Sequence, residues 1–183
     1  MNKVRTKLHA VWVHFGEVLY NFVFTHVPSH RFRQAMLRLW GARIGKDSAI
    51  FRGTTVLGIT GIDIGDASVI GFRCLLDARG GLTIGDSVVI ASDVHFIAGH
   101  HLPNSDDFSY ILAPITVGDH AWIASRSMVL ANVDIGRGAV IGACSLVRKD
   151  VPERTIAAGI PAKHIADRRS NLSYRPVYRP KFF

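Results

Sequence analysis

The chain has little of what would mark a secreted, metal-stapled or membrane-spanning protein. Its 183 residues include only two cysteines, Cys74 and Cys144, which excludes a disulfide framework and the paired spacing of a zinc site. We find no secretory signal peptide and no apolar run long enough to cross a bilayer, so we expect a cytoplasmic protein. A hydrophobic content of 48% rules out general disorder and predicts a folded core.

Acidic residues are scarce at both ends of the chain. Residues 1–46 carry eight Lys and Arg against Glu17 alone, a net charge of +7, and residues 163–183 carry +5, which leaves −4 between them. A nucleic-acid-binding domain would more often spread basic and aromatic side chains over its folded surface, so we do not expect one. Basic ends on an acidic middle favour an anionic membrane surface or a phosphate-bearing ligand.

The strongest pattern is an aliphatic residue at every sixth position. A spacing of six fits neither a helix nor an isolated strand, and it is typical of a hexapeptide-repeat β-helix, where one hexad covers one flat face and three complete a coil. We therefore predict an all-β parallel β-helix. The members of the longest series are Val117, Ile123, Val129, Ile135, Ile141 and Val147, and shorter series begin at Ile44, Ile64 and Ile84.

The distances between equivalent residues predict where the chain leaves the β-helix. Ile44, Ile64 and Ile84 lie twenty residues apart, which is three hexads with a two-residue extension. The thirty-three residues from Ile84 to Val117 exceed such a coil by about thirteen, so we expect a protruding loop within about 100–112. Cys74 stands four places after Ile70, where a small side chain faces the interior, and we expect it to be a core residue.

The flanks are predicted to be helical and extended. Apolar residues from Leu8 to Phe22 repeat at three and four, and Pro28-Ser29 can stop this helix and cap a second one that ends near Gly41. We expect these helices to cap the first coil. The predicted organisation is amphipathic helices in 1–43, the β-helix in 44–165 and a basic aromatic tail in 166–183.

Histidines at the predicted loop are the best candidates for chemistry. His100 and His101 stand where the loop leaves a rigid coil, and an imidazole is suited to act as a general base near neutral pH. Asp77 and Arg79 lie in an unusual corner, Asp77 to Gly81, where Asp77 could hydrogen-bond a hydroxylated substrate as well as shape the turn. A metal site would need a third histidine at an equivalent position in a neighbouring coil, and none stands there.

Several segments together resemble the hexapeptide-repeat acyltransferases. Residues from about Pro28 to the end are similar to the sugar and exopolysaccharide O-acetyltransferases, a group that includes galactoside and colanic acid acetyltransferases. The segment at 157–163 is the part specific to these enzymes. The matching segments are 76–85, 101–105, 113–115, 122–125, 141–143, 149–152 and 157–163.

The resemblance implies a left-handed β-helix, a homotrimer and acetyl-CoA held between neighbouring subunits, without a metal. His101 matches the family's catalytic base, while Asp77, Arg79 and His100 are assigned to acceptor binding. Leu102 stands where many relatives have Asp, so any carboxylate help in orienting His101 must come from elsewhere, and Asp106 and Asp107 are available in the loop. The positions assigned to acetyl-CoA are Trp122, Ser125, Ala143, Arg148, Lys149 and Lys163.

The function that the resemblance implies is acetyl-CoA-dependent O-acetylation of a sugar, a surface polysaccharide or a glycolipid precursor. The basic ends add the expectation of peripheral contact with the inner face of an anionic membrane. Three other functions stay open at this point: N-acetylation of an amino sugar or O-acetylation of an antibiotic, metal-dependent hydration on the same fold, and a trimeric scaffold without catalysis.

Overall fold

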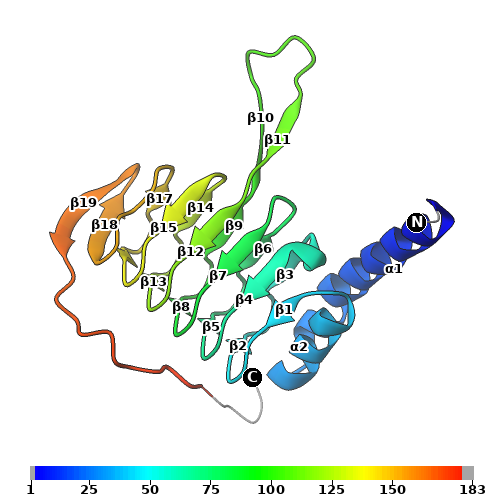
Figure 1. Ribbon diagram of the computed structural model, residues 1–183, viewed down its shortest axis with the longest axis horizontal. Helices are drawn as coiled ribbons and strands as arrows, with labels where there is room; N and C mark the ends of the chain where they lie inside the picture. The colour runs from blue at the N-terminus through cyan, green and yellow to red at the C-terminus, as the bar shows by residue number, and fades with distance from the viewer. Residues whose placement is uncertain (1–2, 179–183) are drawn as a thin grey trace.

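The computed structural model describes residues 3–178, with side chains from residue 7 onward, and it is a parallel β-helix capped by helices at its N-terminal end (Figure 1). Three sheets form its walls. Sheet A contains β1 (Arg43–Ile44), β4 (Ile62–Ile64), β7 (Leu82–Ile84), β12 (Ile115–Val117) and β15 (Val133–Ile135). Sheet B contains β2 (Ala49–Ile50), β5 (Val69–Ile70), β8 (Val89–Ile90), β13 (Trp122–Ile123), β16 (Val140–Ile141), β18 (Thr155–Gly159) and β19 (Ala162–Asp167). Sheet C contains β3 (Thr55–Leu57), β6 (Leu75–Asp77), β9 (His95–Ile97), β14 (Met128–Leu130) and β17 (Leu146–Val147).

The register of the strands confirms the predicted repeat. In sheet A, Ile64 pairs with Ile84, and Ile84 pairs across the thirty-three-residue interval with Val117, which in turn pairs with Ile135. Each of these side chains is almost fully buried, because a residue that points inward stacks on its equivalent in the next coil. Cys74 also lies in the interior as predicted, and burial raises the pKa of its thiol to about 12.

Aspartates at the corner between sheets A and B join one coil to the next. The Asp66 carboxylate accepts a hydrogen bond from the Lys46 N–H, Asp86 accepts from the Asp66 N–H and Asp119 from the Asp86 N–H, at 2.6, 2.6 and 2.8 Å. Each aspartate stands two residues after the inward-facing aliphatic residue of a sheet A strand. The structure shows that each also satisfies a backbone donor of the neighbouring coil.

The second predicted helix is confirmed with its caps. It is α2 (His30–Leu39), which follows the short helix η1 (Phe24–His26); a second short helix, η2 (Ile59–Gly61), joins β3 to β4. The Ser29 side chain accepts a hydrogen bond from the Phe32 N–H, and Gly41 follows the helix with φ of +106°. Buried residues of α2 include Leu37 and Gln34, and the Gln34 amide donates to the Ser48 carbonyl of the first coil.

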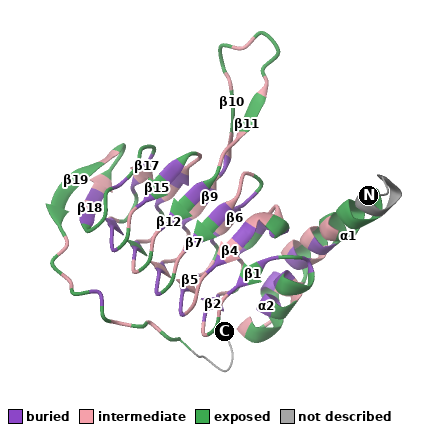
Figure 2. Cartoon of the chain, viewed as in Figure 1, coloured by how far each residue is buried: buried purple, intermediate pink, exposed green. Residues whose placement is uncertain are grey.

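The first helix, α1 (Lys3–Phe22), also packs at the first coil, but with its polar side inward. Asn21 exchanges two hydrogen bonds with the backbone of Val56, at 2.8 and 2.9 Å, and Glu17 accepts one from the Gly58 N–H at 2.6 Å. These side chains satisfy backbone groups beside β3, the edge strand of sheet C. Most of the apolar stripe that predicted the helix is exposed, as the green outer surface of α1 shows (Figure 2).

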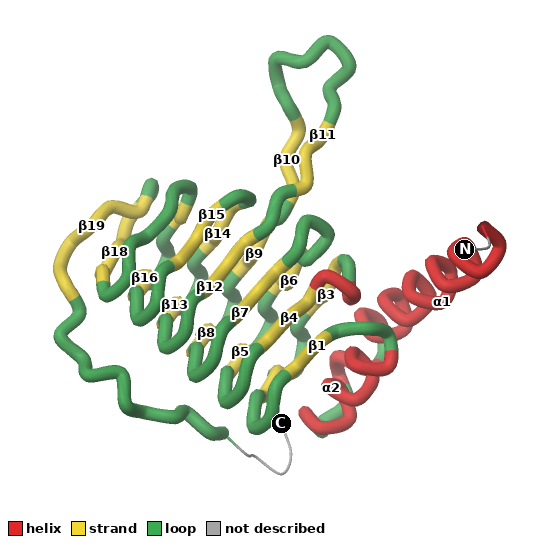
Figure 3. Tube along the Cα trace, viewed as in Figure 1, coloured by secondary structure: helices red, strands yellow, loops and turns green. Residues whose placement is uncertain are grey.

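The tail after β19 turns back along the β-helix toward the first coil (Figure 3). Arg168 donates to the carbonyls of His120 and Gly138, and further along Arg175 forms an ion pair with Asp47 at 3.0 Å. Leu172 is 3% exposed. The tail therefore runs as a strap from the last coil to the first; its predicted residues 179–183 lie outside the described part of the chain.

Candidate functional site

The predicted loop is a β-hairpin that projects from the third coil between β9 and β12 (Figures 1 and 3). Its strands are β10 (Gly99–His101) and β11 (Tyr110–Leu112), which pair antiparallel with Gly99 opposite Leu112 and His101 opposite Tyr110. The sequence located the excursion but did not predict this pairing. Because the stem is hydrogen-bonded, the two histidines are held on a strand rather than on a free loop.

His101 has a defined orientation at the outer end of β10. Its Nδ1 lies 2.8 Å from the Phe108 carbonyl oxygen, and its ring stacks on the Phe108 ring with centroids 4.3 Å apart and planes 8° apart. A carbonyl oxygen can only accept, so Nδ1 carries the proton and Nε2 is left with a lone pair. The arrangement is that of an imidazole ready to accept a proton at Nε2.

Neither Asp106 nor Asp107 is hydrogen-bonded to His101 in the described chain. The Asp107 carboxylate accepts hydrogen bonds from the Ser105 hydroxyl and from the Ser109 N–H, and these bonds hold its pKa below its ordinary value. No hydrogen bond or ion pair of Asp106 or Asp107 with His101 occurs among the interactions of the described residues. In the described chain, the partner of His101 Nδ1 is the backbone carbonyl of Phe108 rather than either of these carboxylates.

Asp77 and Arg79 form an ion pair behind the hairpin. The Asp77 side chain is 2% exposed and accepts from Arg79 Nε and Nη2, both at 2.8 Å, and from the Ala98 N–H at 3.2 Å. Burial alone would raise the pKa of Asp77, but the hydrogen bonds and charge of Arg79 and the Ala98 N–H outweigh it and lower the pKa. Asp77 is thus occupied within the chain, and the group available to a ligand is the half-exposed Arg79 guanidinium.

Two hollows beside the hairpin bring predicted site residues together. One, of about 110 Å³, is lined by Arg79, His100 and His101 together with Gly99, Tyr110 and Leu112. The other, of about 390 Å³, lies against sheet C and has mostly apolar walls, with His100 and Arg148 among its lining residues. His100 contributes to both, so it links the predicted base to Arg148, which lies two coils further along the same corner of the β-helix.

The other residues assigned to acetyl-CoA lie elsewhere on the chain. Ser125 and Ala143 are on adjacent coils at the corner between sheets B and C, whereas the hairpin leaves from the corner between sheets C and A. Trp122 faces outward from sheet B and is 46% exposed, and Lys163 is exposed on β19. Lys149 is exposed beside Arg148. One hexad, up to about 20 Å of extended chain, separates the two corners, so a single chain does not bring Ser125 to His101.

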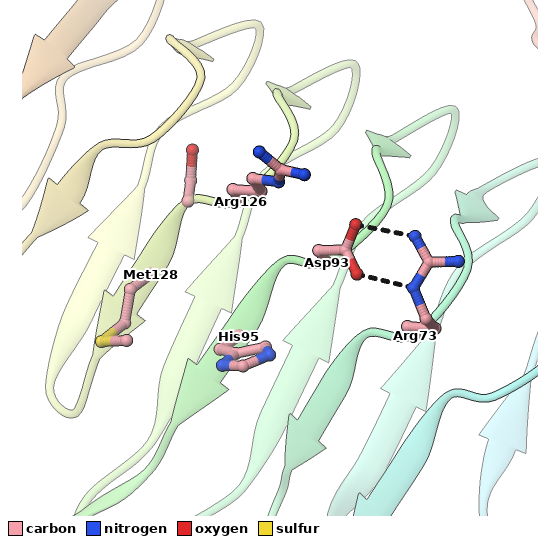
Figure 4. A pocket seen from close by; sticks show the side chains of 6 residues that line it. Arg73, Asp93, His95, Arg126 and Met128 are labelled. Atoms are coloured by element: carbon pink, nitrogen blue, oxygen red, sulfur yellow. Dashed lines mark hydrogen bonds and ion pairs between the residues drawn. The ribbon is translucent and has the colours of Figure 1, made fainter.

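A third hollow, of about 480 Å³, was missed from the sequence (Figure 4). It lies at the corner between sheets B and C, next to Ser125, and its lining residues include His95, Arg126 and the ion pair between Arg73 and Asp93. A signal was present, because Arg73, Asp93 and Arg126 are separated by 20 and 33 residues, the same intervals as Ile64, Ile84 and Val117. Equal intervals place side chains one above another on neighbouring coils.

The described residues contain no group of three or more His, Cys, Asp or Glu side chains arranged to hold a metal ion. The hydratase alternative requires three histidines contributed by adjacent subunit faces. The described hollows offer His95 at one corner, and His100 and His101 at another.

Comparison with known proteins places the chain in a family. The model for bacterial transferase hexapeptide repeats matches residues 108–149. The chain is 34% identical to the putative colanic acid biosynthesis acetyltransferase WcaF of Escherichia coli over 147 residues, 80% of this chain and 81% of that protein. It is 30% identical to the galactoside O-acetyltransferase of Escherichia coli over 156 residues, covering 82% and 75% of the two chains.

Solved structures show the same fold. A hexapeptide-repeat acetyltransferase of Vibrio cholerae, complexed with acetyl coenzyme A, superposes with a TM-score of 0.77 at 21% identity over 92% of this chain and 91% of that one. Galactoside acetyltransferase in complex with coenzyme A gives 0.74 at 24% identity over 88% and 81%. The repeat, the hairpin and these relatives lead to one conclusion: the chain belongs to the hexapeptide-repeat acetyltransferases.

Proposed function

We propose that the protein transfers the acetyl group of acetyl-CoA to a hydroxyl of a sugar, either in a surface polysaccharide or in a glycolipid precursor. The observation that carries the proposal is the orientation of His101. Its Nδ1 donates to the Phe108 carbonyl, which leaves Nε2 as an acceptor at the exposed end of the hairpin stem. The colanic acid and galactoside acetyltransferases among its relatives support a sugar hydroxyl as acceptor.

In the proposed reaction, His101 Nε2 takes the proton of the acceptor hydroxyl as its oxygen attacks the thioester carbonyl carbon. A C–O bond forms, the C–S bond then breaks, and the protonated His101 returns its proton to the departing thiolate. The Ser125 N–H is a candidate donor to the oxyanion of the intermediate, since the N–H groups of Trp122 and Ala124 already donate to the carbonyls of Ala139 and Ile141. A cysteine nucleophile is not needed, and the buried Cys74, with its raised pKa, is unsuited to the role.

The proposed active site is shared between copies of the chain. His101 and Arg148 lie along one corner of the β-helix, and Ser125 and Ala143 lie along another. A homotrimer in which one copy supplies the hairpin and the next supplies Ser125 and Ala143 would unite them. Small residues there would let the pantetheine arm lie against the coils, and Arg148, Lys149 and Lys163 would face the phosphates of acetyl-CoA.

The acceptor side of the site is assigned to Arg79 and His100, which line the same hollow as His101. Asp77 acts through Arg79, because both carboxylate oxygens accept from that guanidinium. A guanidinium beside the base suits an acceptor with several hydroxyls or with an acidic group. Transfer to the amine of an amino sugar or to an antibiotic hydroxyl is the alternative, and the acceptor panel below distinguishes them.

The test is acceptor-dependent release of free thiol from acetyl-CoA across sugars, glycans, amino sugars and hydroxylated antibiotics. Wild type is compared with His101→Ala and with His26→Ala, an exposed histidine on η1 that serves as the matched control. We expect His101→Ala to lose about 100-fold to 10,000-fold in kcat while keeping its oligomeric state and acetyl-CoA affinity.

His100→Ala separates the two adjacent histidines. We expect it to raise KM for the acceptor while leaving most of kcat, because His100 lines the hollow without holding the proposed proton acceptor. Loss of kcat only in His100→Ala would move the base by one residue. Failure of wild type to bind acetyl-CoA would instead support the scaffold alternative.

A further inference from the structure

The helix α1 is amphipathic, but its apolar side is exposed, whereas a helix that covers a core buries its apolar side. Glu17 and Asn21 are bound to the backbone at Gly58 and Val56, so the polar side faces the β-helix. The apolar side faces mostly away: six of its large side chains are between 43% and 78% exposed, and one of them, Trp12, also contacts the Trp40 ring with centroids 6.0 Å apart. These residues are Leu8, Val11, Trp12, Phe15, Val18 and Phe22, which we call the α1 apolar face.

The packing of α1 fixes this orientation. Tyr20 is fully buried, and Gly16 lies against Trp40 of the α2 C-terminus so closely that a Cβ there would meet the indole ring. Rotating the helix to bury the α1 apolar face would break the hydrogen bonds of Glu17 and Asn21. Spacings of three and four residues set the six side chains on one continuous stripe, and a contiguous exposed stripe of this kind marks a contact surface.

The charge around the α1 apolar face identifies what covers it. Glu17 is the only acidic residue among residues 1–46, and its carboxylate is turned inward to the Gly58 N–H. The first turn of α1 contains no acidic residue, whereas Lys3, Arg5 and Lys7 all stand in its first half. Positive charge at a helix N-terminus opposes the helix dipole, so these residues are unfavourable for the isolated helix. An anionic surface beside them removes that penalty.

The structure distinguishes α1 from the other basic end of the chain. The tail was an equal candidate for membrane contact in the sequence, but Arg175 is paired with Asp47, and the Tyr178 ring packs on Phe51 with centroids 5.2 Å apart. Arg168 is bound to two backbone carbonyls. The described tail is therefore held on its own β-helix, and α1 is the end with a free apolar face.

We infer that α1 lies in the surface of an anionic phospholipid bilayer, with the α1 apolar face in the acyl boundary and its basic first half among the headgroups. Within residues 3–178, none of the helices combines the length and the apolar character needed to cross a bilayer. The inferred contact is accordingly one in which α1 lies along the membrane surface. It explains both the inverted helix and the uncompensated basic first turn.

This position restricts the acceptor, a step that rests on the proposed function. The hairpin leaves the third coil, so two strand spacings of about 4.8 Å separate it along the β-helix from the first coil. The hairpin therefore leaves the β-helix within two coils of the end that carries α1, which suits a glycan carried on a lipid and held near the headgroups.

The test is flotation of the full-length protein with vesicles of phosphatidylcholine alone or mixed with phosphatidylglycerol, at physiological salt. We expect wild type to float with the mixed vesicles and not with phosphatidylcholine alone. Val11→Asp/Phe15→Asp should lower the partition coefficient by about 100-fold, because it puts two charges in the apolar stripe. The control Ile165→Asp changes a side chain that is 62% exposed on β19 and should float like wild type.

Any other flotation result overturns the inference. Equal flotation of wild type with both vesicles, or no flotation, removes the anionic bilayer as the partner. A change in oligomeric state of Val11→Asp/Phe15→Asp without vesicles would show that a second copy covers the face. Acetyl transfer to a lipid-linked and to a soluble glycan acceptor is measured in parallel. Flotation without transfer would leave the membrane inference standing and the proposed function refuted, and transfer without flotation would do the reverse.

Discussion

In the coils of the β-helix, at least one apolar side chain is buried on each strand from β1 to β9 and from β12 to β17, whereas none of the residues 99–112 in the hairpin is buried. Each coil repeats the same packing, in which an inward-facing side chain stacks on the equivalent side chain of the next coil. The side-chain contacts of the hairpin do not recur in other coils. An example is the hydrogen bond between His101 Nδ1 and the Phe108 carbonyl. Stability is therefore expected to reside in the coils, and chemistry in an element that contributes little to the core.

This difference predicts that substitutions in the two regions have separable effects. A coil substitution should lower the free energy of unfolding and leave kcat of the folded protein unchanged. A hairpin substitution should change kcat and leave unfolding unchanged. The ion pair of Asp77 and Arg79 joins the two regions, since Asp77 belongs to a coil strand and accepts from the Ala98 N–H at the base of the hairpin.

The largest effect is expected for Ile70→Ala in the core of the second coil. Ile70 is fully buried on β5, and shortening it leaves a cavity that costs about 2–5 kcal/mol of unfolding free energy. The measurement is urea unfolding, with kcat determined well below the transition. Val69→Ala, at the outward-facing neighbour on the same strand, is the matched control and should cost about 1 kcal/mol or less. A lower kcat in folded Ile70→Ala would contradict the separation.

Asp77→Asn should affect both regions. It removes a buried charge that accepts two hydrogen bonds from Arg79, and we expect a loss of about 1–3 kcal/mol together with a higher KM for the acceptor, since Arg79 loses its anchor. Denaturant unfolding and acceptor kinetics measure the two effects. An unchanged KM would show that Arg79 keeps its place without Asp77 or does not meet the acceptor.

The same substitution has a pH dependence of known sign. Because the folded-state pKa of Asp77 is lowered below its ordinary 3.8, the ionised carboxylate contributes stability above that pH, and the contribution is lost as the pH falls through the folded-state pKa. Wild type and Asp77→Asn should therefore differ by a constant amount above about pH 4 and converge as the pH falls from there through the folded-state pKa. Unfolding measured at a series of pH values would contradict the assignment if the difference widened in acid.

Phe108→Ala tests the hairpin alone. It removes the ring that stacks on His101 but keeps the carbonyl that accepts from Nδ1. We expect about a 10-fold lower kcat, because the imidazole gains freedom to leave its aligned position, and no change in unfolding, since Phe108 is 59% exposed. The measurement is kcat beside a thermal unfolding curve. Loss of stability comparable to that of Ile70→Ala would break the division between coil and hairpin.

The coils could be predicted from the sequence, and the geometry of the site could not. A six-residue period determines which side chains point inward, so the pairing of Ile84 with Val117 followed from their spacing despite the thirty-three-residue interval. The hairpin has no such period. The Phe108 carbonyl is a backbone group that any residue would supply at that position. Its hydrogen bond to His101 therefore could not be predicted from the type of residue. The orientation of α1 also escaped prediction, because an apolar stripe indicates a helix without saying what covers it.

The smallest effect is expected for Leu102→Asp, which places a carboxylate directly after His101. Its own N–H is bound to the Ser109 carbonyl at 2.8 Å, so the backbone beside it is already held in the hairpin. Because the Phe108 carbonyl already accepts from His101 Nδ1, a new carboxylate finds that position occupied. We expect kcat to stay within about twofold of wild type, measured by thiol release at saturating acceptor. A tenfold increase would show that the carbonyl orients His101 poorly, and that this hairpin works below the rate its scaffold permits. An unchanged rate would instead show that the Phe108 carbonyl already holds His101 in the tautomer that the base requires.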